Sequence, residues 1–281
     1  MIIFHIGLSK AGSSSLQALF SKVNGALFFD KPNVWSDIDN YSLYESFFAE
    51  IDILGRDNIV FVSHEHMIMP INEPNTGISV VSTRHAKVLL ERIHNMVSET
   101  EVIILNRDVF SILQSRYFQY MIQGGSLRPK VFLDYLIFNN NDKFEFIDYR
   151  NDTFVKLFES CKIVNGFIYD AKFFLEYSNL IIWLKNHGVY LSRNDYNKAS
   201  SKNVGVSYFS GNLIRLINYI FVLEKETLIA PPKVRCCYRM WFYLVHGVRY
   251  IDKYINKIFK VKRKGVFNDS LRRRLISEGH K

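Results

Sequence analysis

Short apolar runs alternate with helical patterns over the first 190 residues, and this alternation constrains the fold more than any other feature of the chain. The runs are continuous, as strands buried on both faces of a sheet require, and they cover residues 1–6, 26–29, 59–62, 101–105 and 162–169. Apolar residues recur at helical spacing between them, which predicts helices from Ser13 or Ser14, over 84–97, from Ile112 to Gly124, and over 174–186. Strands that alternate with helices predict an α/β fold, with a mostly parallel central sheet covered by helices on both faces.

Right-handed crossovers between parallel strands bring the strand-to-helix loops to one edge of the sheet. Ligands in such folds bind outside the carboxyl ends of the strands. Residues 7–15, 63–67 and 106–109 each follow a predicted strand. We therefore expect these three segments to build the functional site.

Charge is distributed unevenly along the 281 residues. The net charge is +9, and residues 233–281 hold 14 Lys and Arg against 3 Asp and Glu, so this C-terminal segment supplies all of the excess. We expect an α/β domain over residues 1–230 and a basic helical extension over 231–281, packed on that domain or facing a membrane. A basic segment of this kind indicates an anionic partner.

The number and spacing of the cysteines and the length of the apolar stretches indicate the cellular compartment. The three cysteines, Cys161, Cys236 and Cys237, form no C-x-x-C pair and are too few for a disulfide framework, so we expect a reducing compartment and no metal. The start of the chain lacks the basic region of a signal peptide, and no apolar stretch reaches the length of about 18 residues that indicates a spanning helix. We therefore expect a cytoplasmic protein, with peripheral contact to a membrane left open.

The segment from Gly7 to Leu16 follows the first predicted strand and opens the first predicted helix. In this context, backbone N–H groups and a helix N-terminus bind phosphate, and the glycines allow close backbone approach. Gly7 and Gly12 have the spacing of the triphosphate-binding motif G-x-x-x-x-G-K-[ST], but Ser13 stands where that motif has lysine, and Lys10 lies inside the loop instead. The sequence therefore predicts a P-loop-like phosphate cradle and disfavours ATP hydrolysis, with a P-loop kinase as the alternative.

The run from His5 to Gln17, H-I-G-L-S-K-A-G-S-S-S-L-Q, resembles a loop of known sulfotransferases. These enzymes use 3′-phosphoadenosine 5′-phosphosulfate (PAPS), and their 5′-phosphosulfate loop is close to H-I-G-x-x-K-T-G-T-T-S-L-Q. Here Ala11 replaces a threonine and loses its hydroxyl, whereas two serines replace threonines and keep theirs. The resemblance implies that the loop residues that bind the cofactor are Lys10, Ala11, Gly12, Ser13, Ser14 and Ser15.

A second motif of the same family binds the 3′-phosphate of PAPS, with an arginine after a later strand and a serine in the following helix. Arg107 follows the predicted strand 101–105, and Ser115 comes eight residues later. The run R-D-V-F-S-I-L-Q-S-R-Y is similar to the family's R-D-P…S-x-Y, with Val109 in place of the proline. The resemblance implies that Arg107 binds this phosphate bidentately and that Ser115 donates its hydroxyl.

Sulfuryl transfer, by analogy with phosphoryl transfer, depends mostly on positioning and electrostatic stabilisation. The resemblance implies that Lys10 stabilises the leaving 3′-phosphoadenosine 5′-phosphate (PAP). The general base is expected within Ser63–Met67, where Glu65 matches the family's acidic position and His66 is the alternative. Successive residues at a strand end point to opposite faces, so both rarely serve at once.

Apolar residues in the basic extension recur at alternating steps of four and three, which predicts a helix with an apolar stripe over Cys237, Trp241, Leu244, Val248, Ile251, Ile255 and Ile258. Several roles stay open for this segment: packing on the core, contact with a membrane through residues 233–264, or a short coiled-coil dimer. Lys262-Arg263-Lys264 reaching the cofactor is a further alternative. We expect no nucleic-acid binding, because the aromatic residues lie on the stripe rather than among the basic residues.

The resemblance points to bacterial, carbohydrate-type sulfotransferases. It implies an enzyme that moves a sulfuryl group from PAPS to a hydroxyl of a carbohydrate or glycolipid acceptor. A degenerate sulfotransferase fold that binds at a membrane without turnover is the alternative from another class, because Ala11 and Val109 depart from the family pattern.

Overall fold

The computed structural model describes residues 1–8, 11–30, 41–64, 67–68, 71–72, 79–80, 83–97, 99–125, 127–134, 151–163, 165–200, 208–221, 238–259 and 273. The chain divides into two compact units, which are described separately. The first comprises Met1–Ile71, Ser79–Val109 and Phe144–Asn203, and the second comprises Asn72–Ile78, Phe110–Lys143 and Val204–Lys281.

A five-stranded parallel sheet forms the centre of the first unit, in the order β2-β3-β1-β6-β7. Its strands are β1 (Ile2–His5), β2 (Ala26–Asp30), β3 (Ile59–Ser63), β6 (Thr100–Asn106) and β7 (Gly166–Asp170). Every residue of β1 is buried, as are all but the first residues of β3 and β6. The parallel sheet predicted from the continuous apolar runs is therefore confirmed. A separate two-stranded sheet pairs β4 (Ile71–Asn72) with β5 (Ser79–Val80).

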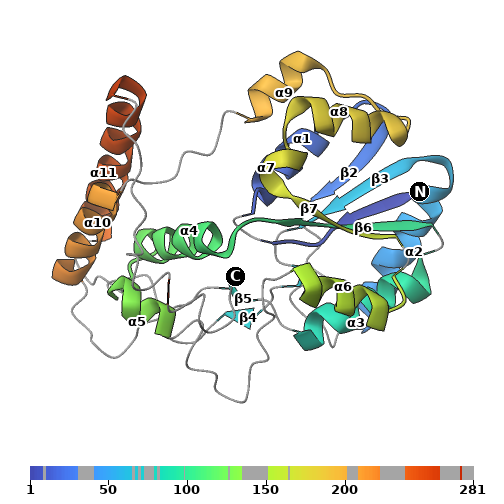
Figure 1. The fold of residues 1–281 in the computed structure, drawn as a ribbon, viewed down its shortest axis with the longest axis horizontal. Coiled ribbons are helices and arrows are strands. Elements are labelled where there is room, and N and C mark those ends of the chain that lie inside the picture. The colour runs from blue at the N-terminus through green and yellow to red at the C-terminus, as the bar shows by residue number, and fades with distance from the viewer. Residues whose placement is uncertain are drawn as a thin grey trace. The chain divides into compact units, whose positions relative to one another are not determined.

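Helices cover both faces of the five-stranded sheet and give the first unit three layers (Figure 1). One face carries α1 (Ser13–Phe20), α7 (Ala171–Phe174), α8 (Tyr177–Asn186) and α9 (Arg193–Ser200). The other face carries α2 (Tyr41–Asp57), α3 (Thr83–Met96) and α6 (Asn151–Ser160). The predicted start of a helix at Ser13 and the predicted helix over 84–97 agree with α1 and α3.

The helix predicted over 174–186 was wrong in its first part, where the structure has two helices. Asp170 caps α7 by accepting a hydrogen bond from the N–H of Phe173 (2.9 Å). The chain then turns at Leu175, and α8 begins at Tyr177. The turn at Leu175 therefore separates the short helix α7, which Asp170 caps, from the longer helix α8.

Aromatic rings pack on both faces of the sheet. Phe20 of α1 stacks on Phe61 of β3 with ring centroids 4.1 Å apart, and Trp183 of α8 lies 6.1 Å from Phe61. On the opposite face, Phe4 of β1 meets Phe48 of α2 edge to face at 5.9 Å. Each such pair adds about 0.5–1.5 kcal/mol beyond the burial of its area, so these rings fix α1, α2 and α8 against the two central strands.

The second unit contains most of α4 (Val109–Ile122), together with α5 (Pro129–Leu133), α10 (Tyr208–Phe221) and α11 (Tyr238–Phe259). Helix α4 ends where the sequence predicts, because the N–H of Gly125 donates to the carbonyl of Tyr120 (2.9 Å) and Gly124 has φ 105°. Asn218 of α10 donates to the carbonyls of Met121 (2.6 Å) and Gly125 (2.8 Å). These bonds fasten α10 to the end of α4.

A helix that crosses a membrane must be both long and apolar. Within the part of the chain that the structure describes, none of the helices is both.

An ion pair between buried Glu101 and half-buried His187 joins the amino end of β6 to the end of α8. Nε2 of His187 donates to Oε2 of Glu101 (3.0 Å), and Nδ1 of His187 donates to the carbonyl of Trp183 (2.8 Å). A carbonyl and a carboxylate both accept, so both ring nitrogens carry protons when these bonds form. Burial by itself lowers the pKa of His187, but the hydrogen bonds to Glu101 and Trp183 outweigh it and raise that pKa above its ordinary value.

Replacement His187→Gln should lower the free energy of unfolding by about 1.5–3 kcal/mol near pH 6, since hydrogen bonding to a charged group is lost. The raised pKa means that the wild-type pair contributes fully below the pKa of an unfolded histidine. Its contribution is lost as the pH rises through the folded pKa. Urea unfolding of both proteins from about pH 6 to about pH 9 checks this, because the difference between them should shrink as the pH rises.

His94→Gln, at an exposed position of α3, is the matched control and should leave the pH dependence unchanged. A difference between wild type and His187→Gln that stayed constant over the whole range would contradict the prediction.

Candidate functional site

The carboxyl ends of β3, β1 and β6 lie side by side, because β1 pairs with β3 on one side and with β6 on the other. The register places His5 beside Ser63 and beside Ile103, so β6 extends three residues farther, to Asn106. The three segments selected from the sequence, 7–15, 63–67 and 106–109, all begin at this edge of the sheet. The topology therefore brings them together.

The chain leaves β1 along β6 before it turns into α1. The N–H of Leu8 donates to the carbonyl of Leu105 (3.3 Å), and the N–H of Leu105 donates to the carbonyl of Gly7 (3.2 Å). The turn closes where the N–H of Ala11 donates to the carbonyl of Leu8 (3.2 Å), and both of these residues are buried. Ser9 and Lys10 lie outside the described residues, and their neighbours on both sides are held by backbone hydrogen bonds.

Gly12 forms the N-cap of α1 in a conformation that favours glycine, with φ 112° and ψ 5°. A Cβ at this position would lie 2.8 Å from Cδ1 of Leu175 and 3.7 Å from Cβ of Ala171. The positive φ and the close approach both require glycine here. Helix α1 therefore begins against the turn that follows β7.

The N-terminus of α1 carries amide donors that a helix cannot satisfy internally. The N–H groups of Ser15 and Leu16 both donate to the carbonyl of Gly12 (3.0 Å each). Among the described residues, no acceptor is assigned to the N–H groups of Ser13 and Ser14, no side chain caps the helix, and the first turn has no acidic residue. Such amides, together with the helix dipole, form a site that favours an anion.

The three serines at the start of α1 lie in different environments. Ser13 is buried, and its hydroxyl donates to the carbonyl of Leu8 (2.6 Å), so this side chain closes the loop. Ser14 is exposed and Ser15 is half-buried. Ser13 therefore offers an anion its backbone N–H, whereas Ser14 and Ser15 are the serines with accessible hydroxyls.

The end of β3 is tied to both β1 and α1. Nδ1 of His5, which is fully buried, shares a hydrogen bond with Oγ of Ser63 (2.7 Å). Nε2 of Gln17 donates to the carbonyl of Ser63 (3.2 Å), and the N–H of His64 donates to the carbonyl of His5 (3.3 Å). These bonds hold the segment after β3 beside the loop after β1.

Glu65 and His66, the two candidates for the general base, lie outside the described residues. The residue before them, His64, is bonded to β1 as described. The residue after them, Met67, is fully buried, and its N–H donates to the carbonyl of His64 (3.3 Å). The flanks of this segment are therefore anchored at the same edge of the sheet as the loop.

Arg107 follows β6 and is exposed, and its N–H donates to Oδ1 of Asn106 (2.8 Å). Ser115 is half-buried in α4 and belongs to the second unit, whereas Arg107 and the loop belong to the first. The structure thus places Arg107 at the edge that carries the loop, and it describes Ser115 within the second unit by itself.

Two polar side chains at this edge were given no role from the sequence, although Asn106 lies in the selected segment 106–109. The side chain of Asn106 is buried and organises the turn to Arg107. Asp170 ends β7 beside Asn106, but its carboxylate is engaged in capping α7. An Asp between a predicted strand and a helix is an N-cap signal that could have revealed the second of these.

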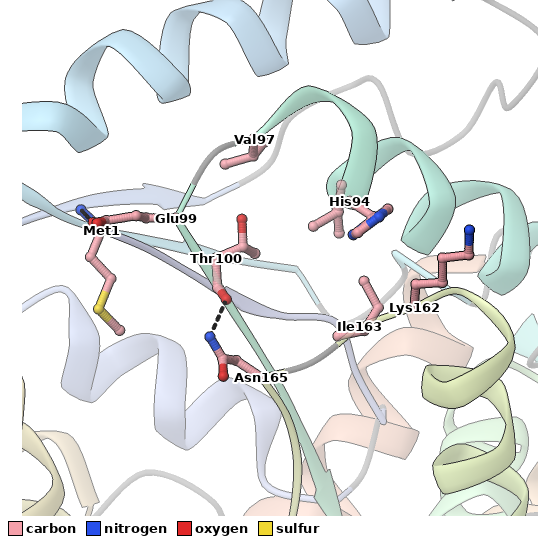
Figure 2. A pocket seen from close by; sticks show the side chains of 9 residues that line it. Met1, His94, Val97, Glu99, Thr100, Lys162, Ile163 and Asn165 are labelled. Atoms are coloured by element: carbon pink, nitrogen blue, oxygen red, sulfur yellow. Dashed lines mark hydrogen bonds and ion pairs between the residues drawn. The ribbon is translucent and has the colours of Figure 1, made fainter.

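A separate pocket of about 490 Å³ lies at the opposite, amino edge of the sheet (Figure 2). It is lined by Met1, Ile93, His94, Val97, Glu99, Thr100, Lys162, Ile163 and Asn165. On one side of it, Nδ2 of Asn165 donates to the carbonyl of Thr100 (3.4 Å). Ligands of parallel α/β sheets bind at the carboxyl edge, so we assign the functional site to the loop after β1 rather than to this pocket.

Comparisons of the chain with protein-family models, with curated proteins and with solved structures found no match. Across the described ranges, no three His, Cys, Asp or Glu side chains gather closely enough to hold a metal ion.

Replacement Gly12→Ala should lower the free energy of unfolding by about 2–3 kcal/mol, because alanine must adopt a strained positive φ and displace the side chain of Leu175. Gly188→Ala is the matched control, since Gly188 also has a positive φ (72°) but no atom within 4 Å of an added Cβ. It should cost about 1 kcal/mol. Urea unfolding measures both variants, and equal losses would contradict the role given to the contact with Leu175.

Proposed function

We propose that this protein is a sulfotransferase that moves a sulfuryl group from PAPS to a hydroxyl of a carbohydrate or glycolipid. The observation that carries the proposal is the loop between β1 and α1, which ends at a helix N-terminus whose first two amides have no acceptor among the described residues. Such a loop suits a phosphate group. Its lysine, Lys10, lies three residues before Ser13, unlike the lysine of loops that bind nucleoside triphosphates.

The residues of the loop fit the 5′-phosphate side of the donor. The N–H groups of Ser13 and Ser14 bind its oxygens, and the hydroxyls of Ser14 and Ser15 add two further donors. The hydroxyl of Ser13 stays bonded to Leu8 and keeps the loop closed. Gly12 contributes its backbone alone, whereas Ala11 is buried with its N–H bonded to Leu8 and helps to hold the loop closed.

The bound donor supplies the sulfuryl group for transfer to the acceptor oxygen. Lys10 stabilises the negative charge that develops on the phosphate side as the sulfur–oxygen bond breaks. Glu65 or His66 accepts the proton of the acceptor hydroxyl. Arg107 and Ser115 bind the 3′-phosphate, for which a guanidinium is the best-suited side chain.

PAP should raise the melting temperature of the protein, and adenosine 5′-phosphate, which lacks the 3′-phosphate, should raise it much less. At a concentration 100 times its Kd, PAP adds about 2.7 kcal/mol of stability. Arg107→Gln should weaken PAP binding by about tenfold or more, because one charge-assisted contact is lost. A thermal-shift titration of each nucleotide measures these effects.

The matched control is Arg56→Gln, which removes an exposed arginine of α2 and should leave PAP binding unchanged. A shift with ATP and Mg²⁺ but none with PAP would favour a kinase and overturn the proposal. Equal binding of PAP and adenosine 5′-phosphate would overturn the role of Arg107.

Lys10→Ala should lower kcat for sulfuryl transfer by about 10²–10³-fold, the usual loss when one electrostatic donor is removed from a transition state. Its melting temperature should match the wild type. Transfer of ³⁵S from labelled PAPS to carbohydrate and glycolipid acceptors measures the rate. Lys22→Ala, at an exposed position just after α1, is the control and should turn over normally. Normal turnover by Lys10→Ala would exclude the role assigned to Lys10.

A further inference from the structure

Helix α11 packs with a different face from the one that its sequence pattern indicates. The predicted apolar stripe includes Leu244 and Ile251, yet both are exposed, Ile251 to 57%. Among the side chains of α11 that the structure describes, the buried ones are Val245 and Asp252, which are seven positions apart and therefore on one side of the helix. Two residues of the predicted stripe, Leu244 and Ile251, thus face away from the side of α11 that packs.

A hydrogen bond between α10 and α11 accounts for this orientation. Oγ of Ser210 donates to Oδ1 of Asp252 (2.8 Å), and both residues are buried where the two helices lie together (Figure 1). A buried carboxylate needs such a partner, because an unsatisfied one is costly. The bond therefore fixes which side of α11 faces α10.

The outward side of α11 is rich in large apolar and aromatic side chains. Tyr243 and Tyr250 are 72% and 73% exposed, and each directly precedes one of the exposed residues Leu244 and Ile251. Exposed apolar groups that gather on one element mark a surface for a partner. Tyrosines are common where one end of a side chain meets lipid and the other meets water.

The charge of α11 complements an anionic surface. Over residues 238–259 the sequence has four Lys and Arg and one acidic residue, Asp252, which is the residue buried against Ser210. Positions 249, 253 and 257 are all basic and follow one another by one helical turn, on one side of the helix. Burial of its single carboxylate thus leaves α11 with only basic and neutral residues to meet a partner.

We propose that the outward face of α11 docks this protein on an anionic lipid bilayer. The helix lies along the bilayer surface, with Leu244 and Ile251 among the outer parts of the acyl chains and the two tyrosines at headgroup depth. The basic residues contact the anionic headgroups. The proposal depends on residues of the second unit alone, so its test is independent of the test for sulfuryl transfer.

The charge also favours a bilayer over a second copy of this chain. A symmetric pairing through α11 would bring basic residues of two copies together, and the one acidic residue of the helix is already bonded to Ser210. Anionic lipid supplies the opposite charge over a broad surface. The chain after residue 259 adds further Lys and Arg to those of α11. The whole segment 233–281 carries 14 of them.

Vesicle co-sedimentation of the full-length protein tests the proposal. Phosphatidylcholine vesicles that contain about 30 mol% phosphatidylserine should bind it at least about tenfold more strongly than vesicles of phosphatidylcholine alone. Binding should fall as NaCl rises from about 50 mM to about 500 mM, because the headgroup attraction is screened. No sedimentation with either vesicle at low salt would overturn the proposal.

Two sets of variants separate the apolar and the charged contributions. The triple change Leu244→Ser, Tyr250→Ser and Ile251→Ser removes apolar contacts and should weaken vesicle binding by about a hundredfold. The double change Arg249→Gln and Lys253→Gln removes charge and should weaken binding by about tenfold, on anionic vesicles only. The control changes Ile53→Ser and Ile182→Ser, at exposed apolar positions of α2 and α8, should bind like wild type.

The melting temperature and the mass in solution of each variant complete the test. The changed positions are exposed, so the triple variant should melt close to wild type. If the wild type were a dimer that the triple variant made monomeric, without loss of vesicle binding, the face would be an interface between copies and the proposal would be overturned. Equal loss of binding in the control variant would overturn it as well.

Discussion

The central position of β1 in the parallel sheet is the constraint on which the rest of the first unit depends. Its backbone pairs with β3 and with β6, and all four of its residues are buried. A strand with neighbours on both sides and helices over both faces must be almost entirely apolar, and its polar member, His5, is bonded to Ser63. The loop that follows β1 must then emerge between the ends of its neighbours. Topology, rather than contacts between site side chains, thus places the loop beside Ser63 and Arg107.

Much of this fold could be predicted because burial on both faces leaves a simple mark on the sequence. Continuous apolar runs located β1, β3 and β6 to within two residues. The last strand begins later than predicted, at Gly166, because a turn with Lys162 at φ 57° follows α6. Helix α9 was missed because it is polar on most sides. Its start is nevertheless marked by Ser192, whose Oγ accepts from the N–H of Asp195 (3.1 Å), a capping pattern readable in the sequence.

The details of the site could be predicted less well, because they depend on contacts between residues distant in the chain. The sequence pattern identified the three serines of α1 as donors, but the bond from Ser13 to Leu8 shows that one hydroxyl is committed to the loop itself.

The apolar stripe identified α11 as a helix, but not the face that packs. That face is set by Ser210 and Asp252, 42 residues apart, and no periodicity within α11 carries this information.

The two proposals share one electrostatic basis. Three of the carboxylates described above are engaged locally, Glu101 by His187, Asp170 by the start of α7 and Asp252 by Ser210. The first turn of α1 has no acidic residue, and α11 has buried its own, so both elements attract anions. The two attractions act over different distances. Amides at the N-terminus of α1 act within one helical turn, through directed hydrogen bonds. Attraction to a charged bilayer extends over a Debye length of about 8 Å at physiological salt. Attachment through α11 should therefore depend more steeply on ionic strength than phosphate binding at α1.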